Sequence, residues 1–189
     1  MHGRKLRLYV LTICLGLILF ASGCAQQTPP DTPSDTAIPT EATSIPVWMD
    51  FELKDVITGE TFKISDFAGR PILLESFAVW CPTCTVQQIE MGNLKQSKGE
   101  SIVHISVNTD PNEDEERVKE HLERNGFDWY FAIAPIEFTN ALIDEFGFNV
   151  VYAPRAPVVL ICGDQTTRFL RGGIKREAAL LEEIEKGCQ

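Results

Sequence analysis

The sequence lacks an excess of positive charge. Its 189 residues contain 17 Lys and Arg against 27 Asp and Glu, which gives a formal net charge of −10. An acidic surface repels phosphate backbones, so nucleic acid is excluded as a favoured partner. No internal repeat is present, and 44% of the residues are hydrophobic, which is enough for one core. We therefore expect one folded domain with some residues left over.

No apolar run reaches the ~20 residues that a membrane-spanning helix needs. The run at residues 8–21 has 14 residues and follows the only charged residues of the first 23, all of them cations. Small residues and then Cys24 come next, an order typical of a secretory signal peptide. Residues 1–23 are therefore interpreted as a signal that is removed.

The end of this signal carries a second pattern. The segment Ala21-Ser22-Gly23-Cys24 resembles the lipobox of prokaryotic lipoproteins, with Ala21 in place of the usual leucine. The resemblance implies lipidation of Cys24 and a lipoprotein anchored to the outer face of the cytoplasmic membrane. Ordinary cleavage near Ala25, which releases the protein, is the alternative.

Residues 24–46 are rich in Pro, Thr, Ser and Asp and show no apolar periodicity. Such a composition is typical of a tether without a core. Residues 47–189 then form the folded domain, in which strands alternate with helices. This order predicts an α/β fold with a central mixed sheet flanked by helices and an N-terminal β-hairpin. The expected strands are 47–53 and 61–64 in the hairpin, then 72–78, 102–107, 131–134, 158–162 and 167–170, and the expected helices are 82–97, 114–124, 139–146 and 175–186.

The most informative segment is Trp80-Cys81-Pro82-Thr83-Cys84. Two cysteines three apart at the start of a helix share one face, and Pro82 suits the first helical position. Free N–H groups and the helix dipole there stabilise a thiolate on Cys81, which is expected to be the more exposed and more acidic thiol. Cys84 is held close enough to break a mixed disulfide. No Lys, Arg or His occurs between residues 71 and 94. The helix terminus must therefore supply most of the stabilisation of the thiolate, unless a distant residue folds in.

Two other uses of the cysteine pair are disfavoured. A zinc site normally takes a second ligand pair at close spacing, and Cys162 and Cys188 are not so spaced. No histidine follows Cys84, which excludes the covalent haem signature. Neither a metal nor another cofactor is expected.

The chain resembles the thioredoxin superfamily, and within it the membrane-tethered, extracytoplasmic thiol–disulfide oxidoreductases of the TlpA and ResA type. The resemblance extends from about residue 45 to residue 187 and rests on the segments 64–71, 77–84 and 157–164. The sequence departs from the family at Gln87 and Gln88, where a Glu is frequent, and at Ala156. These departures concern substrate preference and leave the redox class unchanged.

The resemblance implies roles for four residues. Cys81 matches the attacking cysteine, Cys84 the resolving cysteine, and Pro157 the cis-proline beside the disulfide. Glu75 matches a buried acid that takes the proton from the resolving cysteine. Its apolar neighbours alone predict that burial raises the pKa of this carboxyl. An acid buried for structure alone is the alternative.

These features predict an enzyme that exchanges disulfides with other proteins, with reduction as the preferred direction. The family implies protein substrates that contain cysteines or disulfides, and a membrane thiol-electron carrier as donor. The segment 77–83 also looks like the peroxidatic loop of peroxiredoxins, with Ala78 in place of their Thr or Ser. A thiol peroxidase is therefore the alternative, and a non-catalytic module on the same fold is a third hypothesis.

The remaining features are expected to be structural. In the inferred topology Cys162 and Cys188 reach the same end of the domain, so we expect a disulfide between them, with two buried free thiols as the alternative. His104 and His121 are isolated. The acidic run 113–116 is typical of a solvated helix start, and selection of partners by charge is its alternative.

Overall fold

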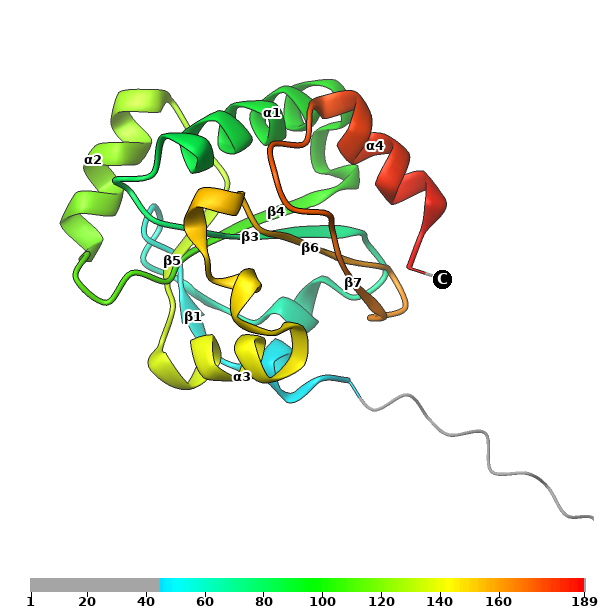
Figure 1. The fold of residues 1–189 in the computed structure, drawn as a ribbon, viewed down its shortest axis with the longest axis horizontal. Helices are drawn as coiled ribbons and strands as arrows, with labels where there is room; N and C mark the ends of the chain where they lie inside the picture. Colours follow the sequence, from blue (N-terminus) through cyan, green and yellow to red (C-terminus); the bar gives the residue numbers. More distant parts are fainter. Residues whose placement is uncertain (1–44, 189) are drawn as a thin grey trace, which may run out of the picture. The chain divides into compact units, whose positions relative to one another are not determined.

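The computed structural model describes residues 45–188, so the predicted signal, Cys24 and most of the predicted tether lie outside the described residues. A five-stranded sheet with strand order β5-β4-β3-β6-β7 forms the centre of the domain (Figure 1). Its strands are β3 (Ile72–Phe77), β4 (Val103–Asn108), β5 (Tyr130–Ile133), β6 (Val158–Ile161) and β7 (Thr167–Phe169). β3, β4 and β5 run parallel, and β6 and β7 pair antiparallel. The predicted mixed sheet flanked by helices is confirmed.

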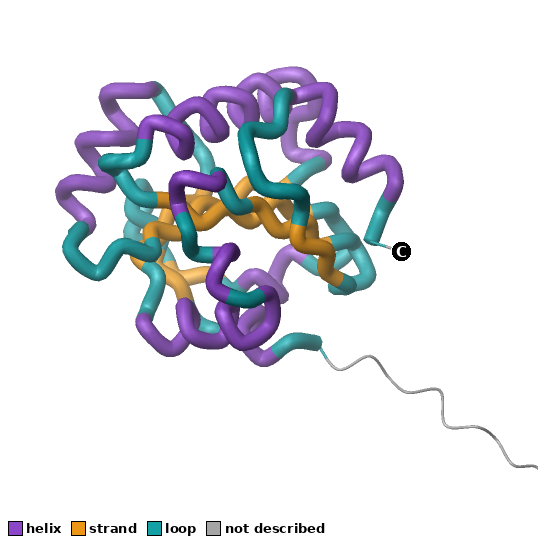
Figure 2. The backbone as a smooth tube through the Cα atoms, viewed as in Figure 1, coloured by secondary structure: helices purple, strands orange, loops and turns teal. Residues whose placement is uncertain are grey.

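Helices cover both faces of this sheet (Figure 2). On one side lie α1 (Pro82–Lys98), α2 (Glu115–Asn125) and α4 (Glu177–Lys186), and on the other lie α3 (Ile136–Phe146) and the 3₁₀ helix η1 (Val47–Asp50). Each helix overlaps its predicted range, and α3 begins three residues earlier than predicted.

The central strand β3 supplies both hydrophobic clusters. Leu73 and Phe77 pack in the cluster under α1, α2 and α4, whereas Ile72 and Leu74 pack in the cluster over α3 and η1. Side chains alternate along a strand, so Glu75 shares the face of Leu73 and Phe77. The strand thus directs this carboxyl toward the helix that begins after the cysteine motif.

The N-terminal hairpin is shorter than predicted. Its strands are β1 (Leu53–Lys54) and β2 (Thr61–Phe62), and residues 47–50 are a 3₁₀ helix, so the predicted strand 47–53 is wrong over most of its length. Trp48 and Met49 are adjacent and both buried, which a strand with one buried face cannot achieve. The turn that follows β1 covers the edge strand β5, where the carboxylate of Asp55 accepts a hydrogen bond from a backbone N–H at 3.1 Å.

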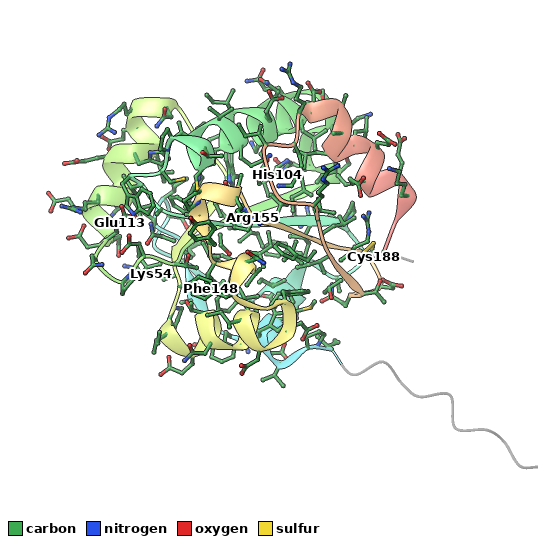
Figure 3. The ribbon with its side chains drawn as sticks, viewed as in Figure 1. Lys54, His104, Glu113, Phe148, Arg155 and Cys188 are labelled. Carbon is green, nitrogen blue, oxygen red and sulfur yellow. A yellow bond between two sulfur atoms is a disulfide. The ribbon has the colours of Figure 1, made fainter. Side chains whose placement is uncertain are left out.

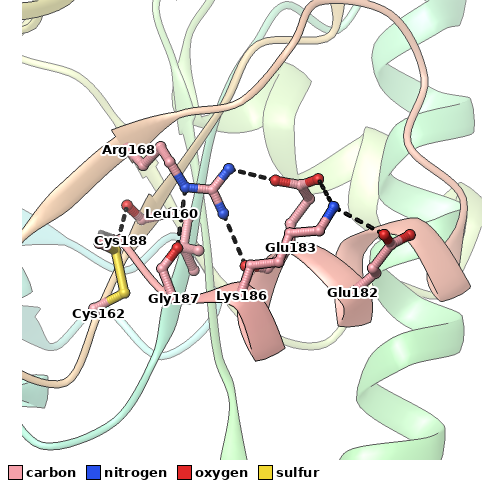
Figure 4. Close-up of polar contacts among 8 residues, drawn as sticks. All are labelled: Leu160, Cys162, Arg168, Glu182, Glu183, Lys186, Gly187 and Cys188. Atoms are coloured by element: carbon pink, nitrogen blue, oxygen red, sulfur yellow. Dashed lines mark hydrogen bonds and ion pairs between the residues drawn. A yellow bond between two sulfur atoms is a disulfide. The ribbon is translucent and has the colours of Figure 1, made fainter.

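Cys162 and Cys188 form a disulfide that fixes the end of α4 to the sheet (Figure 4). Their Cα atoms lie 6.0 Å apart. The guanidinium of Arg168 reinforces this attachment, because it donates to the carbonyls of Gly187 at 3.0 Å and Glu183 at 2.8 Å and pairs with the Glu183 carboxylate. The last helix is therefore held by both covalent and polar contacts.

Removal of this disulfide should lower the stability of the domain. The bridge closes a sequence separation of 26 residues, for which the chain-entropy account gives about 3 to 4 kcal/mol. We expect the double variant Cys162→Ala/Cys188→Ala to lose this much free energy of unfolding in guanidinium melts. An unchanged unfolding midpoint, with the wild-type bridge verified by mass analysis, would contradict the assigned role.

Candidate active site

The cysteine motif lies where β3 ends and α1 begins. Cys81 is the N-cap residue of α1, and Pro82 is its first residue. Both Cys81 and Cys84 are free thiols, and they are 1% and 0% exposed. The two thiols therefore hardly differ in exposure, because both cysteines belong to the hydrophobic cluster that also contains Ala153. The exposed residue of the motif is Trp80, at 58%.

Cys84 lies in surroundings that oppose its ionisation. Its Sγ donates to the carbonyl of Ala153 at 3.3 Å, in the 3₁₀ helix η5 (Ala153–Arg155). Burial raises the pKa of Cys84 well above its usual range, and the charge of Glu75 raises this pKa further. This thiol needs a base to become a nucleophile, as a resolving cysteine would.

Glu75 is fully buried on the face of β3 that carries α1. Ser106 Oγ donates to Glu75 Oε2 at 2.9 Å and in turn accepts from Trp129 Nε1 at 3.1 Å. Glu75 Oε1 has no hydrogen-bond partner among residues 45–188. Burial raises the pKa of Glu75 to about 8, against the opposing effect of the Ser106 hydrogen bond. The predicted burial is confirmed, and the carboxyl is largely protonated at neutral pH.

Lys175 is a site residue that the sequence reasoning missed. Only 8% of it is exposed, and its Nζ donates to the carbonyls of Ala156 at 2.5 Å and Gly173 at 2.7 Å. Burial lowers the pKa of Lys175 to about 8, while the charges of Glu75 and Cys84 act to raise it. This cation comes from a part of the chain distant in sequence, and its charge favours the ionised form of Glu75.

Gln87 explains how Lys175 reaches this position. The Gln87 side chain on α1 accepts from the Lys175 N–H at 2.7 Å and donates to the Lys175 carbonyl at 3.1 Å. These two bonds fix the backbone of the segment before α4 against α1. Gln87 was noted only as a departure from the family, and nothing in the local sequence around Lys175 marks it as buried.

The backbone beside these groups is strained at one residue. Ala156 is buried and has a φ of +45°, a conformation that a residue with a Cβ adopts at a cost of about 1–3 kcal/mol. The Lys175 ammonium stabilises this conformation through its bond to the Ala156 carbonyl. The next residue, Pro157, directly precedes β6, and its carbonyl accepts from Ser76 N–H at 3.3 Å. The role of Pro157 stays a prediction.

The acidic run after β4 differs from the prediction at its first residue. Asp114 caps α2 by accepting from Arg117 N–H at 2.9 Å, and Glu115 and Glu116 begin the helix at the surface as expected. Glu113, however, is 9% exposed and is not solvated. The reason is that its carboxylate accepts hydrogen bonds from the active-site turn.

Asp110 supplies a second acidic contact to this turn. Its Oδ2 accepts from the exposed Trp80 through the indole Nε1 at 2.6 Å, and hydrogen bonds from Asn112 and Trp80 lower the pKa of Asp110. A cavity of about 200 Å³ opens beside these residues. Its lining includes Ala78, Trp80, Asp110, Tyr152, Ala153 and Pro154.

The two histidines are buried structural residues. Burial lowers the pKa of His104 to about 4 and lowers the pKa of His121. His121 Nε2 lies 2.7 Å from Gln88 Oε1. Within residues 45–188 no group of three or more His, Cys, Asp or Glu side chains is arranged to hold a metal ion. In the same part of the chain no helix is long and apolar enough to cross a membrane.

Comparison with known proteins identifies the family of the chain. Residues 40–160 match the Redoxin family. The chain belongs to the Redoxin family. It is 30% identical over 104 residues to the thioredoxin-like protein YneN of Bacillus subtilis, and 26% identical over 98 residues to an uncharacterized protein of Haemophilus influenzae. These matches cover 54% and 52% of the chain, and 55% and 58% of the relatives, so the chain spans little more than half of their length.

Solved structures show the same fold. A thiol:disulfide interchange protein of the thioredoxin family from Chlorobium tepidum superposes with a TM-score of 0.63 at 16% identity, over 74% of this chain and 93% of that one. StoA from Bacillus subtilis superposes with a TM-score of 0.54 at 18% identity, over 70% and 93%. The predicted thioredoxin-like fold is thereby confirmed.

The buried carboxyl should make stability depend on pH. Because the pKa of Glu75 is raised, the stability linked to it is fully present below the unfolded value of ~4.3 and is lost as pH rises through about 8. We expect Glu75→Gln to gain stability relative to wild type by about 1.4 kcal/mol per pH unit across this window. Urea melts at pH 5, 6.5 and 8 measure the difference. The exposed Glu52→Gln is the control, and parallel profiles for wild type and Glu75→Gln would contradict the raised pKa.

Proposed function

We propose that this chain is an extracytoplasmic thiol–disulfide oxidoreductase that reduces disulfides in other proteins. The observation that best supports this proposal is the pair of free cysteines at the start of α1, with the Cys84 thiol close to the buried Glu75 and Lys175. An apolar structural site has no need of two buried ionisable groups of opposite charge, because their desolvation destabilises the fold. Beside a thiol that must lose a proton, Glu75 can accept the proton and Lys175 can stabilise the resulting negative charge.

In the proposed reaction the Cys81 thiolate attacks one sulfur of a substrate disulfide. A Cys81–substrate disulfide forms, and the other substrate sulfur leaves as a thiolate. Cys84 passes its proton to the Glu75 carboxylate and attacks the Cys81 sulfur, which releases the second substrate thiolate. The substrate gains two electrons, and the chain ends with a Cys81–Cys84 disulfide.

The charges assist the second step. Glu75 accepts a proton only when it is ionised, and the Lys175 ammonium favours this form. A pKa of about 8 also makes the Glu75 carboxylate a stronger base than a carboxylate in water, which suits acceptance of a proton from a thiol. Lys175 additionally offers a positive charge to the thiolate that develops on Cys84.

The proposed location follows from the N-terminal sequence. Lipidation of Cys24 would anchor the chain on the outer face of the membrane, and residues 24–46 would tether the domain. A disulfide between Cys162 and Cys188 suits an oxidising compartment. A fold neighbour from Mycobacterium tuberculosis is described as secreted, which is consistent with this proposal. A membrane thiol-electron carrier would return the Cys81–Cys84 disulfide to the dithiol.

Parallel assays of insulin reduction and hydrogen peroxide consumption test the proposal. We expect the full chain in detergent to reduce insulin and Cys81→Ser to fall to the uncatalysed background, because the attacking sulfur is lost. Cys84→Ser should accumulate mixed disulfides with protein partners, because Cys81 still attacks and nothing resolves the product.

Each alternative gives a different result. Peroxide consumption that depends on Cys81 and exceeds insulin reduction would replace the proposal with a thiol peroxidase. Rates that do not change in Cys81→Ser would mean that the domain is a non-catalytic module. The Cys162→Ala/Cys188→Ala variant is the control for general loss of a disulfide, and it should keep its insulin activity at temperatures where it remains folded.

A further inference from the structure

One buried carboxylate next to the cysteines has no part in the mechanism above. Glu113 lies beside α2, just before that helix begins (Figure 3). Both of its carboxylate oxygens accept hydrogen bonds from the turn between β3 and α1. Oε2 accepts from Val79 N–H at 2.7 Å and from Asn108 Nδ2 at 2.6 Å, and Oε1 accepts from Trp80 N–H at 3.2 Å. All of these donors are neutral. Among the ion pairs of residues 45–188 none includes Glu113, so its charge is not paired with a cation.

The loop that carries Glu113 is held rigidly by its own hydrogen bonds. Asn108 is the last residue of β4, is 1% exposed, and accepts from Asp110 N–H at 3.3 Å. Glu113 N–H donates to the Asp110 carbonyl at 3.2 Å, and Asp110 also accepts from the Trp80 indole. The carboxylates of Asp110 and Glu113, both from this loop, therefore accept hydrogen bonds from the turn that precedes Cys81.

We propose that Glu113 is a positioning residue that fixes the turn before Cys81 and, through its charge, shifts the Cys81–Cys84 couple toward the disulfide. This inference rests on the proposed function and assigns a regulator of its redox equilibrium. Val79 and Trp80 immediately precede Cys81, so the carboxylate lies within ~10 Å of that sulfur, a range over which salt screens little. A negative charge there opposes the thiolate of the reduced form and leaves the neutral disulfide unaffected.

The redox equilibrium with glutathione measures this effect. Two glutathione molecules reduce the Cys81–Cys84 disulfide to the dithiol and are themselves joined as oxidised glutathione, and a proton is released where the Cys81 thiol ionises. Glu113→Gln removes the charge, while the amide oxygen in the place of Oε2 keeps the bonds to Val79 and Asn108. We expect its equilibrium to shift about tenfold toward the dithiol, which is a potential about 30 mV less negative for a two-electron couple.

Glu116→Gln is the matched control, because it removes the same charge from the exposed start of α2. Its equilibrium constant should equal that of wild type. An equal constant for Glu113→Gln and Glu116→Gln would overturn the proposed role of the charge. The glutathione equilibrium needs no protein substrate, so a chain that fails to reduce insulin would refute the proposed function without deciding this inference.

Hydrogen exchange in the unaltered chain tests the positioning role even if Glu113→Gln does not fold. Trp80 is 58% exposed, yet its N–H and that of Val79 are bonded to a carboxylate. We expect both amides to exchange at least ~100-fold more slowly than unprotected amides, as measured by NMR. Exchange of either amide at the unprotected rate would show that the turn opens freely and would overturn the positioning role.

Discussion

The carboxyl of Glu75 is removed from water in the middle of the sheet, and the surrounding structure is arranged around the cost of burying it. Ser106 gives it one hydrogen bond, and Trp129 fixes the orientation of Ser106. Lys175 supplies a charge of opposite sign, and burial still leaves the pKa of Glu75 at about 8. The group is thus a neutral acid below about pH 8 and a carboxylate base above it. That property is what the neighbouring thiol of Cys84 requires.

Contacts from sequence-distant segments maintain this arrangement. Gln87 on α1 fixes the backbone of Lys175, and Lys175 holds Ala156 in a left-handed conformation before Pro157. The disulfide at Cys188 and the contacts of Arg168 fix the far end of the helix that follows Lys175. Contacts thus attach the chain at both ends of α4, through Lys175 before the helix and through Cys188 after it.

The sequence predicted those parts of the molecule that depend on local patterns. The apolar run of β3, the cysteine spacing and Pro82 at the start of α1 lie in neighbouring residues, and the strand and helix were located from them. Glu75 was found because a charge inside an apolar run is a conspicuous exception. The burial of Lys175 and Glu113 was not predicted, because nothing in their local sequence distinguishes them from exposed charged residues. Both are buried by contacts with segments that are far away in the chain. The strand predicted at residues 47–53 was wrong because Trp48 and Met49 are buried together by tertiary packing, which overrides a weak local preference.

A single-turnover reaction with a coloured aromatic disulfide shows whether Glu75 accepts the proton of Cys84. Attack by Cys81 releases one equivalent of chromophore, and attack by Cys84 releases the second, so the second phase reports the resolving step alone. We expect this phase to accelerate about tenfold per pH unit and to level off near pH 8, where Glu75 is ionised. In Glu75→Gln the phase should be slower, and the break near pH 8 should be absent. The same pH profile in wild type and Glu75→Gln would show that Glu75 does not accept the proton.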